Sequence, residues 1–331
     1  MEKRSDQTSI LENLGRFCRA CIVSIVSVGP IPVHIAFIMD GNRRYAKKKN
    51  LLEGTGHRFG YLALINMLKC CYELGIKYVT IYAFSIDNFK RRPEEVESTM
   101  KLIQEKIEEL IKEESLLNIY GVRVYFLGNL KLLNKSVRLT AERAMAATAG
   151  NSKAVLSICV GYTSTDEIVH AVQECCERKW DEIRELDSSG AGYGLISIGT
   201  NEESKGENIV GVADIEKHMY AAVVPDPDII IRTSGETRLS NFLLWQSADS
   251  LLYSPSILWP EIGFRHLVWA VLDFQRNFHY LKKKGKESEV SWWKSIPRIL
   301  KYCLFWMVGI LILFQFHSLS QKNVEIVWGF F

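Results

Sequence analysis

The segment HIAFIMDGNRR, residues 34–44, joins an apolar run of strand length to side chains that could do chemistry. The apolar run is followed by Asp40, Gly41, Asn42, Arg43 and Arg44. In open α/β sheets, ligands bind at the carboxyl ends of the strands. Arginine forks match phosphate oxygens in pairs, whereas a carboxylate beside them repels a phosphate unless a divalent cation lies between them. The segment predicts either a metal-diphosphate site or a strand-to-helix turn with solvated charges.

A second candidate lies seventeen residues after Asp40, where a helical pattern begins. His57 stands there in the stretch GTGHRFG, residues 54–60, whose glycine spacing fails the dinucleotide fingerprint by one residue. We therefore do not expect a nicotinamide cofactor. A helix N-terminus with unsatisfied N–H groups and an imidazole suits a phosphate, although a histidine at a helix start is also an ordinary surface or capping residue.

Two further loops carry polar and basic groups. The strand predicted at Lys77–Phe84 runs into SIDNFKR, which supplies Ser85, Asn88 and Arg91. The segment IRTSGETRLSNFLLWQ, residues 231–246, places Arg232, Arg238 and Ser240 around a Ser-Gly turn. Arginines six apart around such a turn can converge on one anion. Two anion sites and apolar helices suggest a substrate with a diphosphate head and an apolar body.

Composition narrows the class of protein. The 331 residues are 47% hydrophobic with a formal net charge of +3, so the chain has material for a real core and too little charge to bind nucleic acid by its field alone. Among eight cysteines, Cys18 and Cys21 form a Cys-x-x-Cys pair without a second pair at metal-ligand spacing, so we expect no zinc site. Neither a P-loop nor an Asp-Asp-x-x-Asp cluster is present.

Strand-like and helix-like patterns alternate through the middle of the chain. Beyond the first strand and Lys77–Phe84, strands are predicted at Val122–Leu127, Ala154–Val160 and Asp228–Ile231. Helices are predicted at residues 57–74, from Pro93, and at 134–149, 165–180 and 263–280. This alternation favours a mainly parallel sheet with helices on both faces.

The two ends differ from the middle. Residues 1–28 have the spacing of an amphipathic helix, which could pack on the domain or lie on a membrane. Residues 29–285 form the expected main domain, with a mobile surface insertion at 187–210. Residues 286–331 contain the apolar run Ile299–Phe316, about 27 Å as a helix, interrupted only by a lysine and a glutamine. We expect this tail to attach to a membrane, either spanning it or lying in it.

Several segments, in order, resemble signature regions of the cis-prenyltransferases, the family of bacterial undecaprenyl diphosphate synthase and eukaryotic dehydrodolichyl diphosphate synthase. They are HIAFIMDGNRR, the Gly56-His57 helix start, YAFSIDNFKR and IRTSGETRLSNFLLWQ. The resemblance covers residues 30–282 and is strongest to plant-type eukaryotic catalytic subunits. It implies an α/β fold with a mainly parallel central sheet, flanking helices and a hydrophobic tunnel, rather than the all-α prenyl synthase fold.

The resemblance also implies an activity and roles for residues. The activity is magnesium-dependent condensation of isopentenyl diphosphate onto an allylic diphosphate such as farnesyl diphosphate, giving a long polycis-polyprenyl diphosphate, the dolichol precursor for protein glycosylation. Asp40 would hold Mg²⁺, Arg232, Arg238 and Ser240 would bind isopentenyl diphosphate, and Ser85 and Asn88 would stand between the two sites. The allylic diphosphate would lie against Gly41, Asn42, Arg43, Arg44 and His57, and Arg91 is a further candidate for substrate binding. The helix from Pro93 is either tunnel wall or ordinary core.

Three departures from the family pattern bear on assembly. Glu53 stands where bacterial relatives have an arginine, Leu251 stands where they have a metal-binding glutamate, and the C-terminal Arg-x-Gly is absent. We therefore expect a Nogo-B-receptor-like subunit to supply Arg-x-Gly in trans. Because of the apolar tail, we also expect the protein at the endoplasmic reticulum membrane, with the catalytic domain facing the cytosol. Rubber-type polymer, a short prenyl diphosphate, a lipid-diphosphate carrier without turnover and a non-catalytic scaffold subunit remain alternatives.

Overall fold

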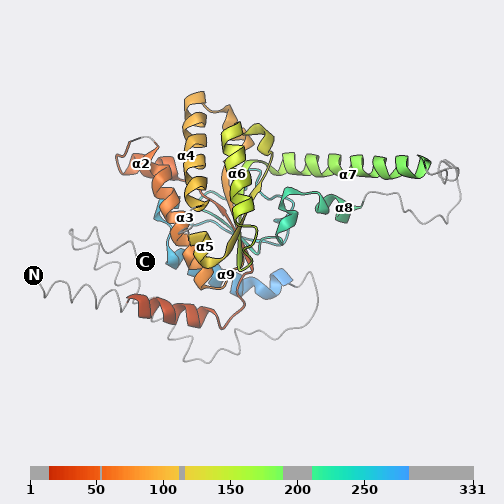
Figure 1. The fold of residues 1–331 in the computed structure, drawn as a ribbon. Coiled ribbons are helices and arrows are strands. Elements are labelled where there is room, and N and C mark those ends of the chain that lie inside the picture. The colour runs from red at the N-terminus through yellow and green to blue at the C-terminus, as the bar shows by residue number, and fades with distance from the viewer. Residues whose placement is uncertain (1–14, 53, 112–115, 189–210, 283–331) are drawn as a thin grey trace, which may run out of the picture. The chain divides into compact units, whose positions relative to one another are not determined.

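The computed structural model describes residues 15–52, 54–111, 116–188 and 211–282 (Figure 1). The chain divides into two compact units. Unit 1 comprises residues 1–79, 227–238 and 247–331, and unit 2 comprises residues 80–226 and 239–246. The terminal tail predicted to reach a membrane, residues 286–331, lies outside the described residues.

The strands form one six-stranded sheet in the order β3-β4-β2-β1-β5-β6. They are β1 (His34–Ile38), β2 (Tyr78–Ser85), β3 (Val122–Leu127), β4 (Ala154–Tyr162), β5 (Ile229–Arg232) and β6 (Leu251–Tyr253). The pairs β1 with β5, β5 with β6 and β3 with β4 are parallel. The predicted α/β class with a mainly parallel sheet flanked by helices is confirmed. The short edge strand β6 was not predicted.

In unit 1, strands β1 and β5 make the centre of the core. Every residue of both strands is buried, as expected for parallel strands covered on both faces. Ile35 pairs with Ile229 and Ile38 pairs with Arg232, so the carboxyl ends of the two strands lie side by side. Helix α9 (Phe264–Lys282) packs on β5 and β6 and also contacts helix α3 (Thr55–Glu73).

Helix α2 (Asn42–Lys48) approaches α3 very closely. A Cβ atom built on Gly56 of α3 would lie 2.1 Å from the backbone oxygen of Asn42, and one on Gly60 would lie 2.2 Å from the Asn42 Oδ1 atom. The short helix η4 (Trp259–Glu261) also packs here, since the Trp259 indole donates to the Gly60 backbone oxygen at 2.8 Å. Two glycines one helical turn apart therefore allow α2 to lie directly on α3.

The described part of the N-terminal segment is helical over residues 15–26 and packs on unit 1. Arg19 donates to Glu73 at 2.7 Å and stacks over the Phe264 ring, 4.5 Å from its centroid. Gln275, almost fully buried, donates to the backbone oxygen of Val26 at 2.9 Å. These contacts bind the helix to α3 and α9, while residues 1–14 of the predicted helix lie outside the described residues.

In unit 2, helices α4 (Pro93–Ile111) and α6 (Lys135–Ala147) lie side by side (Figure 1). Met100 and Ile107, on the apolar face predicted for α4, are buried, and Gln104 accepts from the Ser136 hydroxyl at 2.9 Å. The remaining elements of the unit are α5 (Leu116–Tyr120), α8 (Val212–Lys217), η1 (Ile86–Lys90), η2 (Leu130–Leu132) and η3 (Tyr220–Val223).

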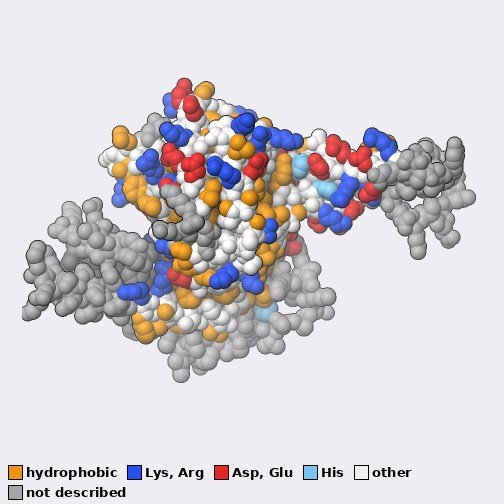
Figure 2. Space-filling view, in the orientation of Figure 1, with side chains coloured by type: hydrophobic (Ala, Val, Ile, Leu, Met, Phe, Trp, Pro, Cys, Tyr) orange, Lys and Arg blue, Asp and Glu red, His pale blue; other side chains and the backbone are white. Residues whose placement is uncertain are grey.

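Helix α7 of unit 2 runs from Ser164 to Ser188, eight residues beyond its predicted end. Side chains of both charges are interspersed along it (Figure 2), including the ion pairs Lys179 with Glu182 and Arg184 with Asp181. Such pairs support a solvated helix that has little core to pack on. The helix thus includes the first two residues of the predicted insertion, and residues 189–210 lie outside the described ranges.

At the base of α7, a buried carboxylate joins three segments of unit 2. Glu167 accepts from the Tyr162 hydroxyl at 2.5 Å, from the Ala221 N–H at 2.8 Å and from the Gln246 amide at 3.2 Å. Burial and the charge of Glu167 raise the pKa of Tyr162. Because each donor satisfies the buried acid, the segment ending at Gln246 is fixed to β4 and α7.

None of the helices within the described residues is long and apolar enough to cross a bilayer.

The α2–α3 approach gives a stability prediction. Alanine usually stabilises a helix relative to glycine, but Gly56→Ala places a methyl against the Asn42 carbonyl, and we expect a loss of about 1–3 kcal/mol in the free energy of unfolding. Gly150→Ala, in the turn after α6, is the control for added volume, because no atom beyond its chain neighbours lies within 4 Å of its Cβ position. Urea unfolding of both variants measures the difference. A Gly56→Ala protein as stable as the control would contradict the close approach.

Candidate active site

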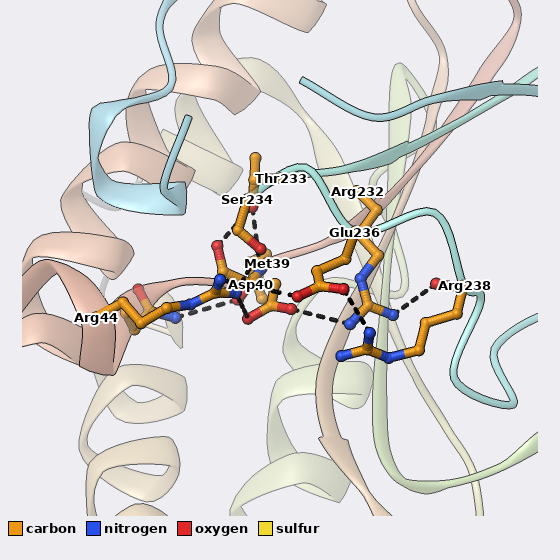
Figure 3. Close-up of polar contacts among 9 residues, drawn as sticks. Met39, Asp40, Arg44, Arg232, Thr233, Ser234, Glu236 and Arg238 are labelled. Atoms are coloured by element: carbon orange, nitrogen blue, oxygen red, sulfur yellow. Dashed lines mark hydrogen bonds and ion pairs between the residues drawn. The ribbon is translucent and has the colours of Figure 1, made fainter. Parts of the chain in front are cut away.

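The site in unit 1 forms where β1 and β5 end. Because Ile38 pairs with Arg232, the residues that follow each strand meet at one edge of the sheet. These residues are Asp40 on one side and the segment Arg232–Arg238 on the other (Figure 3). Helix α2 begins at Asn42, two residues after Asp40, and contributes Arg44. The parallel pairing therefore brings together two loops about 190 residues apart in sequence.

The backbone of Asp40 is fixed by the buried side chain of Thr233. The Thr233 hydroxyl donates to the Asp40 backbone oxygen at 2.6 Å and lies 3.1 Å from the Asp40 N–H, from which it accepts. The backbone N–H of Trp259 donates to the same Asp40 oxygen at 2.9 Å. Thr233 and Trp259 are both fully buried. The backbone of Asp40 is therefore held by hydrogen bonds with two buried residues.

The carboxylate of Asp40 lies between two guanidinium groups. Arg232 donates to Oδ2 at 2.9 Å and Arg44 donates to Oδ1 at 3.1 Å. Burial acts to raise the pKa of Asp40, but the hydrogen bonds and charges of the two arginines outweigh it and hold this pKa below its ordinary value. The Arg232 side chain is only 7% exposed, whereas Asp40 is 27% exposed and Arg44 is 50% exposed, so the ion pairs run from the interior to the solvent.

The loop after Thr233 turns sharply and is held by backbone hydrogen bonds. Ser234 has φ 74° and Gly235 has φ 71°, and their N–H groups donate to the backbone oxygens of Ile257 and Pro255. Arg232 also donates to the backbone oxygen of Arg238 at 2.6 Å, which closes the loop on itself. The loop therefore returns the backbone of Arg238 to the side chain of Arg232, while the convergence of both arginines on one anion stays a prediction.

Two residues of this loop, neither predicted from sequence, contact the arginines. The Ser234 hydroxyl accepts from Arg44 at 2.6 Å. Glu236 accepts from Arg238, and its Oε1 lies 3.8 Å from Nη1 of Arg44. The cluster thus contains three guanidinium groups and two carboxylates (Figure 3). It can bind an anion that carries several oxygens and replaces part of these ion pairs.

Gly41, Asn42, Arg43 and His57 surround the start of α2 and α3. Gly41 has φ 111° and contacts Leu258, a backbone conformation and a space that only glycine fits without strain. Asn42 donates to the Met39 backbone oxygen at 3.2 Å. Arg43 is exposed on α2, and His57 is half-buried in the first turn of α3.

Four predicted residues belong to unit 2. Ser85 precedes η1 and accepts from the Asp87 N–H at 3.1 Å, while the Asn88 side chain accepts from the Ser85 N–H at 3.1 Å. Arg91 pairs with Glu95 at 3.0 Å. Ser240 has φ 51°, and its backbone oxygen lies 3.4 Å from the Tyr82 hydroxyl, which donates to it. Ser85 and Asn88 therefore cap one short helix together.

Within the described residues, no group of three or more His, Cys, Asp or Glu side chains could form a metal site. Mg²⁺ is often held by one or two carboxylates together with substrate phosphates, so a full protein cage is not required. Each oxygen of Asp40 accepts one arginine hydrogen bond and retains a further lone pair. The donor set therefore fits a magnesium ion that arrives with a diphosphate.

The sequence profile of the family described as putative undecaprenyl diphosphate synthase matches residues 38–282, which include every site residue discussed above. This chain belongs to that family, the cis-prenyltransferases. The prediction made from the four sequence segments is confirmed, and the protein is a prenyltransferase enzyme.

Individual relatives agree with this assignment. The cis-prenyltransferase is 69% identical over 279 residues to dehydrodolichyl diphosphate synthase CPT3 of Solanum lycopersicum, covering 84% of this chain and 96% of the relative. It is 42% identical over 268 residues to the human dehydrodolichyl diphosphate synthase complex subunit DHDDS, covering 81% of this chain and 73% of the relative. A crystal structure of lavandulyl diphosphate synthase from Lavandula x intermedia with dimethylallyl diphosphate is similar with a TM-score of 0.59 and 26% identity, covering 74% and 95% of the two chains.

The hydroxyl of Thr233 gives a second prediction. Thr233→Val keeps the volume but removes both hydrogen bonds to the Asp40 backbone, and we expect it to lower the free energy of unfolding by about 1–2 kcal/mol. Thr233→Ser retains the hydroxyl and should recover most of the loss. Thermal and urea unfolding measure the effect. Equal stability of the valine and serine variants would contradict the role of the hydroxyl.

Proposed function

We propose that this cis-prenyltransferase condenses isopentenyl diphosphate onto an allylic diphosphate such as farnesyl diphosphate and forms long polycis-polyprenyl diphosphates. The observation that carries the proposal is Asp40, which is fixed by Thr233 and held between Arg44 and Arg232. A carboxylate and several guanidinium groups at the ends of parallel strands suit two diphosphates and a divalent cation. The crystallised lavandulyl relative, which carries dimethylallyl diphosphate, supports an allylic diphosphate as one substrate.

The proposed roles of the side chains divide between the two substrates. Arg232, Arg238 and Ser240 bind the diphosphate of isopentenyl diphosphate, and Ser85 and Asn88 act near the point where the proton is lost. Arg91 is a further proposed substrate-binding residue. The allylic diphosphate is bound by Gly41, Asn42, Arg43, Arg44 and His57. Catalysis then depends on aligning two carbon atoms and stabilising the negative charge of a leaving diphosphate. The apolar face of α4 is the proposed wall of a product tunnel.

Asp40 is the proposed ligand of Mg²⁺. When bound, the ion would neutralise charge that develops on the departing diphosphate. Arg44 and Arg232 keep the pKa of Asp40 low, so its carboxylate is ionised at neutral pH and ready for the metal. Arg44 also faces Ser234, whose hydroxyl fixes the direction of the guanidinium beside the leaving group.

The proposed product is a dolichol precursor, and the proposed active form is a complex. The tomato relative named dehydrodolichyl diphosphate synthase supports the product. The human relative is named as a complex subunit, which supports assembly with a second chain. Because the chain lacks a C-terminal Arg-x-Gly, a Nogo-B-receptor-like subunit would supply it in trans. Asp40, His57, Arg232 and Arg238 argue against a non-catalytic scaffold role.

Co-expression with and without the candidate partner tests the reaction. With labelled isopentenyl diphosphate, farnesyl diphosphate and magnesium, the complex should make long polyprenyl diphosphate, and Asp40→Asn should lower the rate about a hundredfold or more because charge stabilisation is lost. Glu73→Gln is a control, since Glu73 pairs with Arg19 instead of the Asp40 cluster. Product length separates dolichol-sized chains from rubber-type polymer and short products. Full activity of Asp40→Asn would refute the proposed site, and full activity of the chain alone would refute the partner.

The proposed location is the endoplasmic reticulum membrane, with the catalytic domain facing the cytosol. Support comes from the sequence alone, namely the apolar run Ile299–Phe316 and the lysines before it. Truncation after Lys286 should move the protein from the membrane fraction to the soluble fraction in cell fractionation. Extraction of the full chain with high salt or carbonate is a useful control, because a spanning segment resists both. An unchanged distribution after truncation would contradict membrane attachment through the tail.

A further inference from the structure

Glu236 is an acidic side chain within the arginine cluster that the proposed reaction leaves without a role. Its carboxylate accepts from Nη1 of Arg238 and lies 3.8 Å from Nη1 of Arg44. By the proposed assignment, these arginines serve different diphosphates, one on each side of Asp40. Glu236 therefore occupies a position in which its two oxygens face groups that would otherwise bind phosphate oxygens (Figure 3).

The loop has a set of hydrogen bonds that do not involve this carboxylate. The backbone around Glu236 is held by the N–H groups of Ser234 and Gly235, which donate to backbone oxygens of Ile257 and Pro255. Arg232 adds a hydrogen bond to the backbone oxygen of Arg238, and Thr233 binds the loop to Asp40. The base of each arginine is thus positioned by contacts that do not involve the Glu236 side chain.

What Glu236 does change is the charge of the cluster. Arg44, Arg232 and Arg238 contribute three positive charges, and Asp40 alone leaves a net charge of +2. Glu236 lowers this to +1. The Glu236 side chain is 31% exposed and Arg238 is 63% exposed, so an incoming phosphate group can reach this ion pair and replace the carboxylate.

We propose that Glu236 is an internal counter-anion that competes with diphosphate for Arg238 and Arg44. Its effect is to weaken the binding of diphosphate groups, so that inorganic pyrophosphate leaves after each condensation and the next isopentenyl diphosphate can bind. A cluster that binds every diphosphate as tightly as possible would retain its product. Glu236 on this account acts through its ion pairs with the two arginines, and the role rests on the proposed function of the cluster as a diphosphate site.

Calorimetric titration with inorganic pyrophosphate tests the proposal. The full-length chain is titrated in the presence of EDTA, so that binding reports the arginines without a metal. Glu236→Gln should bind pyrophosphate about two- to fivefold more tightly than the wild type, the range expected from one partly exposed ion pair. The gain should shrink at high salt, because ions screen exposed charges.

Two variants serve as matched controls. Glu236→Asp retains the charge and should bind pyrophosphate with an affinity near that of the wild type. Glu261→Gln removes a carboxylate of similar exposure, 29%, that pairs with Lys48 at 2.7 Å outside the cluster, and it should leave pyrophosphate binding unchanged.

Steady-state kinetics of the active enzyme provide a second readout. Glu236→Gln should lower KM for isopentenyl diphosphate and lower kcat by a similar factor, and pyrophosphate should inhibit it more strongly than the wild type. A merely structural role would instead raise KM or reduce stability. Glu236→Asp should restore both kinetic constants toward wild-type values.

The outcomes distinguish the role of Glu236 from the proposed function of the arginine cluster. If the wild type binds pyrophosphate and Glu236→Gln binds it equally or more weakly, the counter-anion role is wrong and the diphosphate site stands. If Glu236→Gln loses its fold, the loop depends on the carboxylate and the proposal is also wrong. If the wild type binds no pyrophosphate either in EDTA or with added Mg²⁺, the proposed function of the cluster fails, and the role of Glu236 fails with it.

Discussion

The bidentate contact between Thr233 and the backbone of Asp40 is the constraint on which the rest of the site depends. One hydroxyl joins the end of β1 to the end of β5 by donating to one backbone group and accepting from another. The backbone of Asp40 is thereby held where its carboxylate can accept from Arg232 and Arg44. Parallel pairing of the two strands brings Asp40 and Thr233 near each other. The buried hydroxyl then fixes the position of one strand end relative to the other.

Each arginine of the cluster is paired with a carboxylate of the same cluster, which holds the guanidinium groups in place without a ligand. Arg232 is almost completely buried, and a buried guanidinium is costly unless its charge and its donors are matched. Asp40 supplies the charge and the backbone oxygen of Arg238 supplies a second acceptor. Arg44 and Arg238 are more exposed and share acceptors on the same loop. The pair of Arg232 with Asp40 therefore lies in the more buried part of the site. The ion pairs of Arg44 and Arg238 with Glu236 lie where a ligand can replace them.

Sequence reasoning predicted the parts of this structure that arise from local pattern. The alternation of strand and helix patterns predicted the parallel sheet. Asp40 and Arg232 were expected at strand ends, which in a parallel sheet lie along one edge. Thr233 and Glu236 were missed because their importance comes from the direction of their side chains in a turn with positive φ angles. Strand β6 was missed because three residues are too few for an alternating pattern. The extension of α7 was missed because ion pairs, rather than an apolar stripe, accompany it.

The glycines of α3 have an effect that reaches beyond packing. Because Gly56 and Gly60 present only hydrogen atoms to Asn42, the first turn of α2 lies as close to α3 as backbone atoms permit. Arg44 is two residues further along the same short helix. The position of its Cα atom therefore depends on how closely α2 approaches the glycines of α3. The position from which Arg44 reaches Asp40 therefore depends on another helix, α3. It is set partly by two residues that have no side chain at all.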